Sequence, residues 1–96
     1  MKAEIEFVGY FISKTGRKII EIDCEDNEAT VLELIIEAEK AMIDRKFEVI
    51  ENGELKKGVL IFRRKENGGM ERIFKLDTLL NKTGENIVMA NLMGGG

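Results

Sequence analysis

The sequence has no histidine, no proline, no tryptophan and a single cysteine, Cys24. Without histidine it cannot form the Ser/His or Cys/His pairs of nucleophilic catalysis, and the usual ligands of transition metals are nearly absent. One cysteine cannot form an internal disulfide, so the fold does not depend on an oxidising compartment. The segment around Cys24, IDCEDNE, is acidic and lacks the cations that activate a thiol. We therefore interpret Cys24 as a small apolar residue of the fold.

Long apolar runs and a concentrated basic surface are missing as well. No apolar stretch is long enough to cross a bilayer, and the first residues, MKAEIEFVG, carry acids and lack the apolar segment of a signal peptide. The net charge is -3, and the short basic clusters RRK (63–65) and KK (56–57) lie among acids. Binding to a phosphate backbone needs concentrated positive charge. We expect a cytoplasmic protein that binds neither a membrane nor nucleic acid.

What the chain does have is the composition of a globular domain. Its 96 residues are 44% hydrophobic and 34% charged, with both signs mixed along the chain. This length supports one modest core, and the sequence contains no repeat or linker. The only sharp change of composition is at Gly94. The sequence therefore predicts a single domain over residues 1–93 and a flexible glycine tail over 94–96.

One segment has a clear helical pattern. Thr30 is placed to cap a helix, and Glu33, three residues later, completes a capping box. Apolar residues then recur at spacings of three and four, which predicts an amphipathic helix with one face against a sheet. This predicted stripe consists of Val31, Leu34, Ile35, Ala38, Ala41 and Met42.

The remaining segments have the pattern of short strands. The first, residues 3–12, alternates between apolar and acidic side chains at its start, and a turn through Gly16 leads to a second strand. Gly-containing turns separate the others. The last strand carries no charge, so we expect it inside the sheet and parallel to the first. The predicted fold class is α+β, with a mixed four- to five-stranded sheet and one main helix on one face. The other predicted strands are 18–25, 47–55, 58–65, 69–76 and 86–93.

The chain ends in three glycines, Gly94, Gly95 and Gly96. A glycine end can be slack, or it can be backbone that threads a narrow channel because no side chain projects from it. The only group that such a tail presents is the α-carboxylate of Gly96, which is inert toward acyl transfer until it is activated, for example by adenylation. Another protein would have to supply ATP, Mg²⁺ and the nucleophile.

This layout resembles the ubiquitin-like β-grasp proteins, and most closely the sulfur carriers of molybdopterin and thiamin biosynthesis and the related small archaeal modifiers. The resemblance is carried by residues 75–96, KLDTLLNKTGENIVMANLMGGG, with its DTLL segment, Gly-Glu turn, apolar strand and terminal diglycine. The chain departs from the molybdopterin carriers in having no proline before the tail and a third glycine, Gly94. These departures leave the pathway open.

The resemblance implies a protein that is not itself an enzyme and binds no cofactor. An E1-like adenylating enzyme would use ATP and Mg²⁺ to adenylate Gly96. The acyl-adenylate would become a thiocarboxylate, as in molybdopterin, thiamin or tRNA-thiolation pathways, and would pass sulfur to a synthase subunit. Alternatively it would be conjugated to lysines, making the chain a small protein modifier. The sequence leaves both outcomes open.

Strand parity suggests a docking surface for that partner. Ile87 and Met89 would face one side of the last strand, and Val88 and Ala90 the other. Residues before the tail either finish the strand or contact the partner. The competing hypothesis is a β-grasp interaction module that binds through its sheet face and has a passive tail. The residues assigned to partner binding are Val88, Ala90, Leu92, Met93, Gly94, Gly95 and Gly96.

Overall fold

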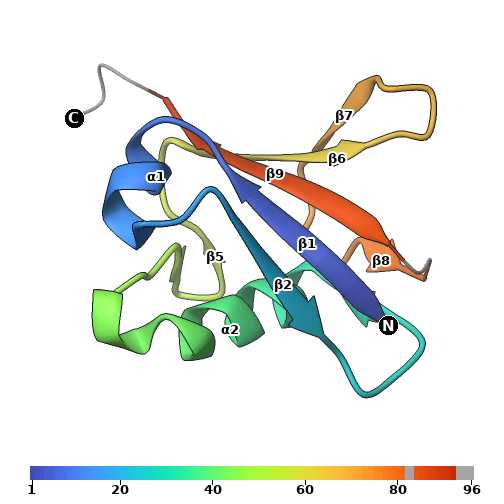
Figure 1. The fold of residues 1–96 in the computed structure, drawn as a ribbon, viewed down its shortest axis with the longest axis horizontal. Helices are drawn as coiled ribbons and strands as arrows, with labels where there is room; N and C mark the ends of the chain where they lie inside the picture. The colour runs from blue at the N-terminus through green and yellow to red at the C-terminus, as the bar shows by residue number, and fades with distance from the viewer. Residues whose placement is uncertain (82–83, 93–96) are drawn as a thin grey trace.

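A five-stranded mixed sheet forms the centre of the computed structural model, which describes residues 1–81 and 84–92 (Figure 1). The strand order is β2-β1-β9-β6-β7. The last strand pairs in parallel with the first, as the sequence predicts, and on its other side it pairs antiparallel with β6. The α+β class and the central position of the last strand are therefore confirmed. The bounds of the strands are β1 (Lys2–Phe7), β2 (Ile19–Asp23), β6 (Val59–Arg64), β7 (Met70–Ile73) and β9 (Glu85–Asn91).

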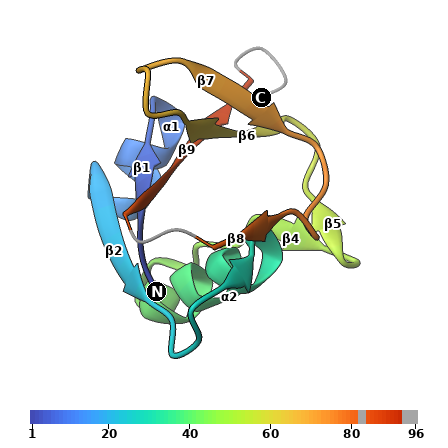
Figure 2. The same ribbon diagram turned by 90° about the vertical axis from the view of Figure 1, so that its right-hand side faces the viewer.

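The helix α2 (Val31–Ala41) covers one face of this sheet, and the other face is open (Figure 2). No helix among the described residues is both long and apolar enough to cross a bilayer. The smaller elements are the helix α1 (Tyr10–Thr15), the 3-10 helix η1 (Ile43–Arg45), and two short antiparallel ladders. The ladders are β3 (Ala29–Thr30) with β8 (Leu79–Leu80), and β4 (Ile50–Glu51) with β5 (Glu54–Leu55).

The start of α2 has the predicted capping box. The Thr30 hydroxyl accepts a hydrogen bond from the Glu33 backbone N–H (3.1 Å), and the Glu33 carboxylate accepts one from the Thr30 N–H (3.2 Å). Such a cap satisfies donors that the first helical turn leaves without partners. Ala41 at the helix end is exposed, so that member of the predicted stripe was wrong. The others are buried: Val31, Leu34, Ile35, Ala38 and Met42.

The predicted first strand, residues 3–12, was wrong beyond Phe7, because the chain turns into α1. Gly9 precedes this helix with a φ of 60°, in the left-handed region that favours glycine and interrupts an extended strand. Phe11 and Thr15 then lie one turn apart and are both buried. The Thr15 hydroxyl donates to the Phe11 carbonyl (O···O 2.7 Å), which ties this turn together.

A nearly buried ion pair joins β9 to β6 at the start of the last strand. Glu85 is 5% exposed, and the guanidinium of Arg63 donates to both of its carboxylate oxygens. The Arg63 side chain is 23% exposed. Because two parallel N–H···O bonds match the carboxylate geometry, the pair is satisfied internally. Removing one partner would leave a charge in a site with little access to water.

We predict that Arg63→Met lowers the free energy of unfolding by about 3 kcal/mol, because it leaves the Glu85 carboxylate without its cation. The control is Arg64→Met. The ion pair between Arg64 and Glu6 is more exposed (side chains 40% and 31%), so its loss should change the free energy by less than about 1 kcal/mol. Urea unfolding at neutral pH, followed by circular dichroism, measures both values. Equal losses in the two variants would contradict this account of the buried pair.

Candidate functional site at the end of the last strand

The last strand is held on both sides as far as Met89, and on its β6 side as far as Leu92. On one side, the Leu92 N–H donates to the Gly58 carbonyl (N···O 2.8 Å). On the other side, the Val8 N–H donates to the Met89 carbonyl (3.0 Å). Figure 1 shows this end of β9 beside α1. The tail therefore starts from a fixed place in the middle of the sheet. Four predicted site residues, Met93, Gly94, Gly95 and Gly96, lie outside the described residues.

Gly58 allows the close approach that ends the strand. Its φ is +90°, and a Cβ at this position would lie 3.0 Å from the Asn91 side-chain oxygen. Asn91 is paired with Val59, the first residue of β6. Any other residue at position 58 would be strained in its backbone and would also crowd Asn91. The glycine thus keeps the last hydrogen bond before the tail in place.

The face of the sheet turned away from α2 carries an apolar patch beside the start of the tail. Val88 on β9 lies opposite Glu6 on β1 and Phe62 on β6, and Ala90 lies opposite Leu60. Because side chains alternate between the two faces of a strand, Val8 after β1, Phe74 after β7 and Ile19 at the start of β2 belong to the same face. We define the outer apolar patch as Val8, Ile19, Leu60, Phe62, Phe74, Val88, Ala90 and Leu92.

The exposed part of this patch comes mainly from residues that the sequence analysis did not single out. Phe74 is 76% exposed and Val8 43%. Val88 does face outward, as its parity predicts, but only 4% of it is exposed. Alternation in the hairpin of β6 and β7 was the available signal for Leu60, Phe62 and Phe74, but it identifies their face only once the register is known.

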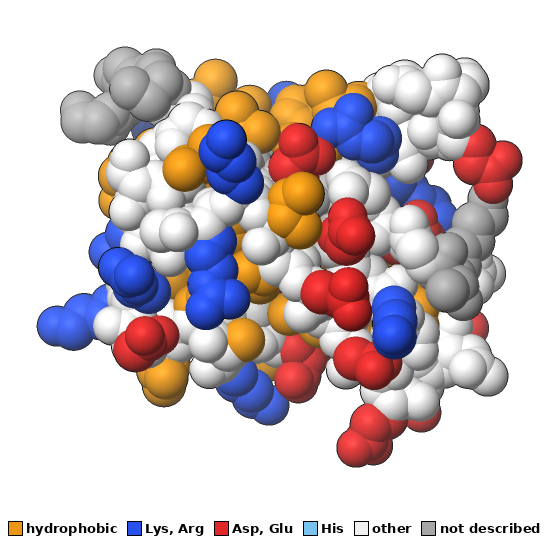
Figure 3. Space-filling view, viewed as in Figure 1, with side chains coloured by type: hydrophobic (Ala, Val, Ile, Leu, Met, Phe, Trp, Pro, Cys, Tyr) orange, Lys and Arg blue, Asp and Glu red, His pale blue; other side chains and the backbone are white. Residues whose placement is uncertain are grey.

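On the outer face of the sheet, the side chains farther from the tail are charged rather than apolar. Arg64 donates to Glu6 (2.8 Å), and the Asn86 amide donates to Glu4 (3.3 Å), which lies opposite Glu21 on β2. In Figure 3, apolar side chains gather in the upper part of the view, and acidic side chains form a line to the right of centre. The outer face thus has an apolar half next to the tail and a charged half away from it.

Side-chain chemistry elsewhere in the described residues is sparse. Cys24 is half-buried, and burial raises the pKa of its thiol; the N-terminal ammonium opposes this rise, and acidic neighbours add to it. The thiol is therefore protonated at neutral pH, which agrees with its interpretation as a small apolar residue. Within residues 1–81 and 84–92, no group of three or more His, Cys, Asp or Glu is placed to hold a metal ion.

A groove lies beneath the turn between β6 and β7, next to the start of β9. Its lining includes Arg63, Arg64 and Lys65. Each of these cations has a carboxylate partner: Glu85 for Arg63, Glu6 for Arg64 and Glu71 for Lys65 (3.8 Å). Because its positive charge is already compensated, this groove is a poor site for an anion. The exposed apolar patch at the other end of β9 is the better candidate for a functional surface.

Comparison with solved structures confirms the fold that the sequence resembles. SAMP1 from Haloferax volcanii superposes with a TM-score of 0.80 at 18% identity, over 100% of both chains. The putative molybdopterin converting factor subunit 1 from Pyrococcus furiosus gives 0.69 at 25% identity, over 96% of this chain and 98% of that one. A chain of the BexX/CysO complex from Amycolatopsis orientalis gives 0.69 at 18% identity, over 98% and 99%.

These structures have the β-grasp architecture expected of the ubiquitin-like sulfur carriers and small archaeal modifiers, so the resemblance drawn from the sequence is confirmed at the level of the fold. No protein-family model matches the sequence, and no curated protein matches it.

We predict that Gly58→Ala loosens the start of the tail. Gly53→Ala is the matched control, since Gly53 has a similar φ of +79° but open space around its Cβ. The control should lose about 1–2 kcal/mol of stability from backbone strain alone. Gly58→Ala should lose more, and the Leu92 amide should exchange with solvent faster. Hydrogen exchange followed by NMR measures this rate, and equal Leu92 exchange in the two variants would contradict a specific role for Gly58.

Proposed function

We propose that this chain is a ubiquitin-like carrier protein whose C-terminal Gly96 is adenylated by an E1-like enzyme. The product is then converted to a thiocarboxylate, conjugated to lysines, or both. The observation that carries this proposal is the junction of β9 with the tail. There, a central strand is hydrogen-bonded on its β1 side as far as Met89 and on its β6 side as far as Leu92, lies beside the exposed outer apolar patch, and is followed in the sequence by Met93 and three glycines. The fold shared with SAMP1 and with the putative molybdopterin converting factor subunit supports the same function.

A fixed junction next to a docking surface sets where the carboxylate can act. Residues 93–96 follow Leu92, and four residues span at most about 14 Å when fully extended. An enzyme that holds the outer apolar patch would therefore need its reactive centre within that distance of the junction. Holding the reacting group in this way replaces a bimolecular encounter with an oriented one. Glycine suits this path because it has no side chain to collide with the walls.

The chemistry would come from the partner. A Gly96 carboxylate oxygen attacks the α-phosphate of ATP, and pyrophosphate leaves; the partner's Mg²⁺ offsets the phosphate charge. The resulting acyl-adenylate has AMP as its leaving group. A sulfur nucleophile that displaces AMP leads to the thiocarboxylate, which a synthase subunit can accept, and a lysine amine that displaces AMP gives an isopeptide bond. In this proposal the chain is not an enzyme and contributes binding and positioning.

The outer apolar patch also supports a second candidate function, an interaction module whose tail is passive. A side chain as exposed as Phe74, held under Arg72 at 4.8 Å from guanidinium to ring centre, is suited to a partner whether or not the tail reacts. The two functions differ in one requirement. The carrier needs Gly96, and the module does not.

Changes in the tail separate these two functions. We predict that deletion of Gly96, or Gly95→Val, reduces ATP–pyrophosphate exchange by the E1-like enzyme of the chain's host to background. The thermal midpoint should not change, because the core lies within the preceding residues. Intact-mass measurement of protein recovered from the host should also show a species in which sulfur replaces one oxygen, or species joined to lysines through Gly96. Normal exchange and partner binding by the truncated chain would favour the module.

Changes in the outer apolar patch test docking. We predict that Phe74→Ser and Val8→Ser each raise the KM for the carrier about tenfold, because each loses roughly 1.5 kcal/mol of apolar burial in the complex. The kcat should stay the same, since binding is lost equally from ground state and transition state. Ile43→Ser is the control, because Ile43 is 77% exposed but lies on η1. An equal rise in KM for the control would remove the patch from the docking surface.

A further inference from the structure

The charges of the described residues separate toward the two ends of β2. The connection before β2, residues 8–18, contains Lys14, Arg17 and Lys18 and no acid. Residues 23–30, from the last residue of β2 through β3, contain four acids and no cation. Because β2 runs between these two segments, they lie at opposite ends of that strand. Figure 3 shows the result, with basic side chains mainly on the left and acidic ones to the right of centre.

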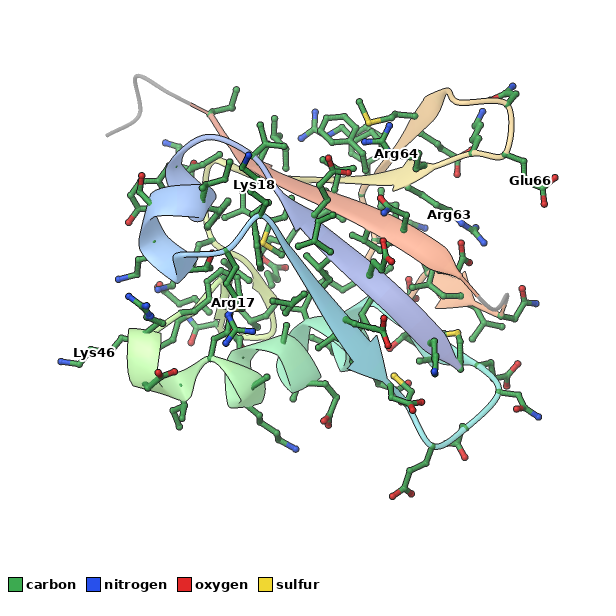
Figure 4. The ribbon with its side chains drawn as sticks, in the orientation of Figure 1. Arg17, Lys18, Lys46, Arg63, Arg64 and Glu66 are labelled. Carbon is green, nitrogen blue, oxygen red and sulfur yellow. The ribbon has the colours of Figure 1, made fainter. Side chains whose placement is uncertain are left out.

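Two further cations join the basic end from η1 and the residue after it. A Cβ at Gly16 would lie 3.1 Å from the Arg45 guanidinium, so Arg45 packs directly over the turn that ends α1. Lys46 follows at the end of η1 with a φ of 53°. Figure 4 shows Arg17, Lys18 and Lys46 on the side of the molecule that carries α1, away from Arg63 and Arg64. We define the basic collar as Lys14, Arg17, Lys18, Arg45 and Lys46.

The basic collar is not neutralised within the described part of the chain. None of its five cations makes an ion pair with a carboxylate of residues 1–81 or 84–92, whereas Arg63, Arg64 and Lys65 at the other end are all paired. Lys46 also holds a left-handed conformation in which glycine would be less strained. Folding alone therefore does not account for this concentration of charge.

The basic collar lies beside the junction of β9 with the tail. The Lys18 carbonyl accepts a hydrogen bond from the Phe7 N–H (2.7 Å), and Phe7 is paired with Met89 on β9. On the other side of the junction, Lys56 and Lys57 directly precede Gly58, whose carbonyl holds Leu92. A partner that receives the tail would therefore meet positive charge on both sides of it.

We propose that the basic collar docks on an acidic protein surface that surrounds the tail-binding site of the adenylating partner, an inference that rests on the proposed function. Complementary charge of this kind steers association and fixes orientation. A protein surface fits better than nucleic acid. The chain carries a net charge of -3, and Glu4 and Glu21 lie together on the outer face, where an extended phosphate backbone would be repelled.

Two double variants with the same net charge test this proposal. Arg17→Gln/Lys18→Gln removes two charges from the basic collar, and Lys2→Gln/Lys65→Gln removes two from the opposite end, so both change the net charge from -3 to -5. At low ionic strength the collar variant should lose about tenfold in kcat/KM for ATP–pyrophosphate exchange, and the loss should shrink as salt is added. The control variant should match the wild type. Equal effects in both variants would overturn the proposal.

Lys46→Gly separates binding from folding. It removes one collar charge and relieves the left-handed backbone, so the thermal midpoint should stay or rise while kcat/KM falls. A loss of activity accompanied by a lower midpoint would instead assign Lys46 a structural role and count against the proposal.

A titration without the enzyme distinguishes failure of this inference from failure of the proposed function. Poly-L-glutamate added to ¹⁵N-labelled wild-type chain should shift the backbone amides of residues 14–18 and 45–46 and leave those of 63–71 in place. Shifts spread over both ends would overturn the inference, as would tighter binding of the wild type to a tRNA pool than to poly-L-glutamate. Absence of adenylation with localised shifts would overturn the proposed function and keep the acidic partner.

Discussion

The parallel pairing of the last strand with the first is the constraint on which the rest of this structure depends. It places β9 between β1 and β6, so the strand pairs with a neighbour along both of its edges. Its apolar residues suit this position, with Ile87 and Met89 in the core under α2 and Val88 buried on the opposite face. Two strands from opposite ends of the chain can pair in parallel only through a crossover, which α2 and the segments around it provide.

Placing the terminal strand in the centre has a direct consequence for function. A tail attached to an edge strand could swing with that edge, whereas β9 is held from both sides as far as Met89 and from the β6 side as far as Leu92. Under the proposed function, the Gly96 carboxylate would be presented from this base, and the side chains around the base would need only to bind a partner. A chain without histidine could serve a reaction in this way. The partner would supply the chemistry, and the fold would supply position.

The sequence predicted features that depend on local patterns and missed those that depend on distant residues meeting. The capping box of Thr30 and Glu33 and the two faces of β9 involve neighbours along the chain, and both were confirmed. The helix α1 was missed because the residues after Phe7 still have the composition of a strand. What ends the strand is the positive φ of Gly9, which the sequence pattern does not reveal.

The surfaces beside the tail could not be predicted from local patterns at all. The outer apolar patch needs the register between β6, β7 and β9, which places Phe62 next to Val88. The basic collar needs Arg45 to reach Gly16 across 29 positions of sequence. In the sequence, the residues of the outer apolar patch and of the basic collar lie in separate segments of ordinary composition. Tertiary packing brings each set together into one surface.

The outer apolar patch and the basic collar would contribute differently to recognition of a partner. Apolar contact supplies affinity, but many proteins with an open sheet face offer it, so it discriminates poorly between partners. Charge placed around the tail discriminates better, because a partner of the wrong sign is repelled before it docks. The side chains of the basic collar contribute little to the stability of the fold, since they form no ion pair within the described chain. Partner choice can therefore change at these positions while the strand pairing that holds the tail stays the same.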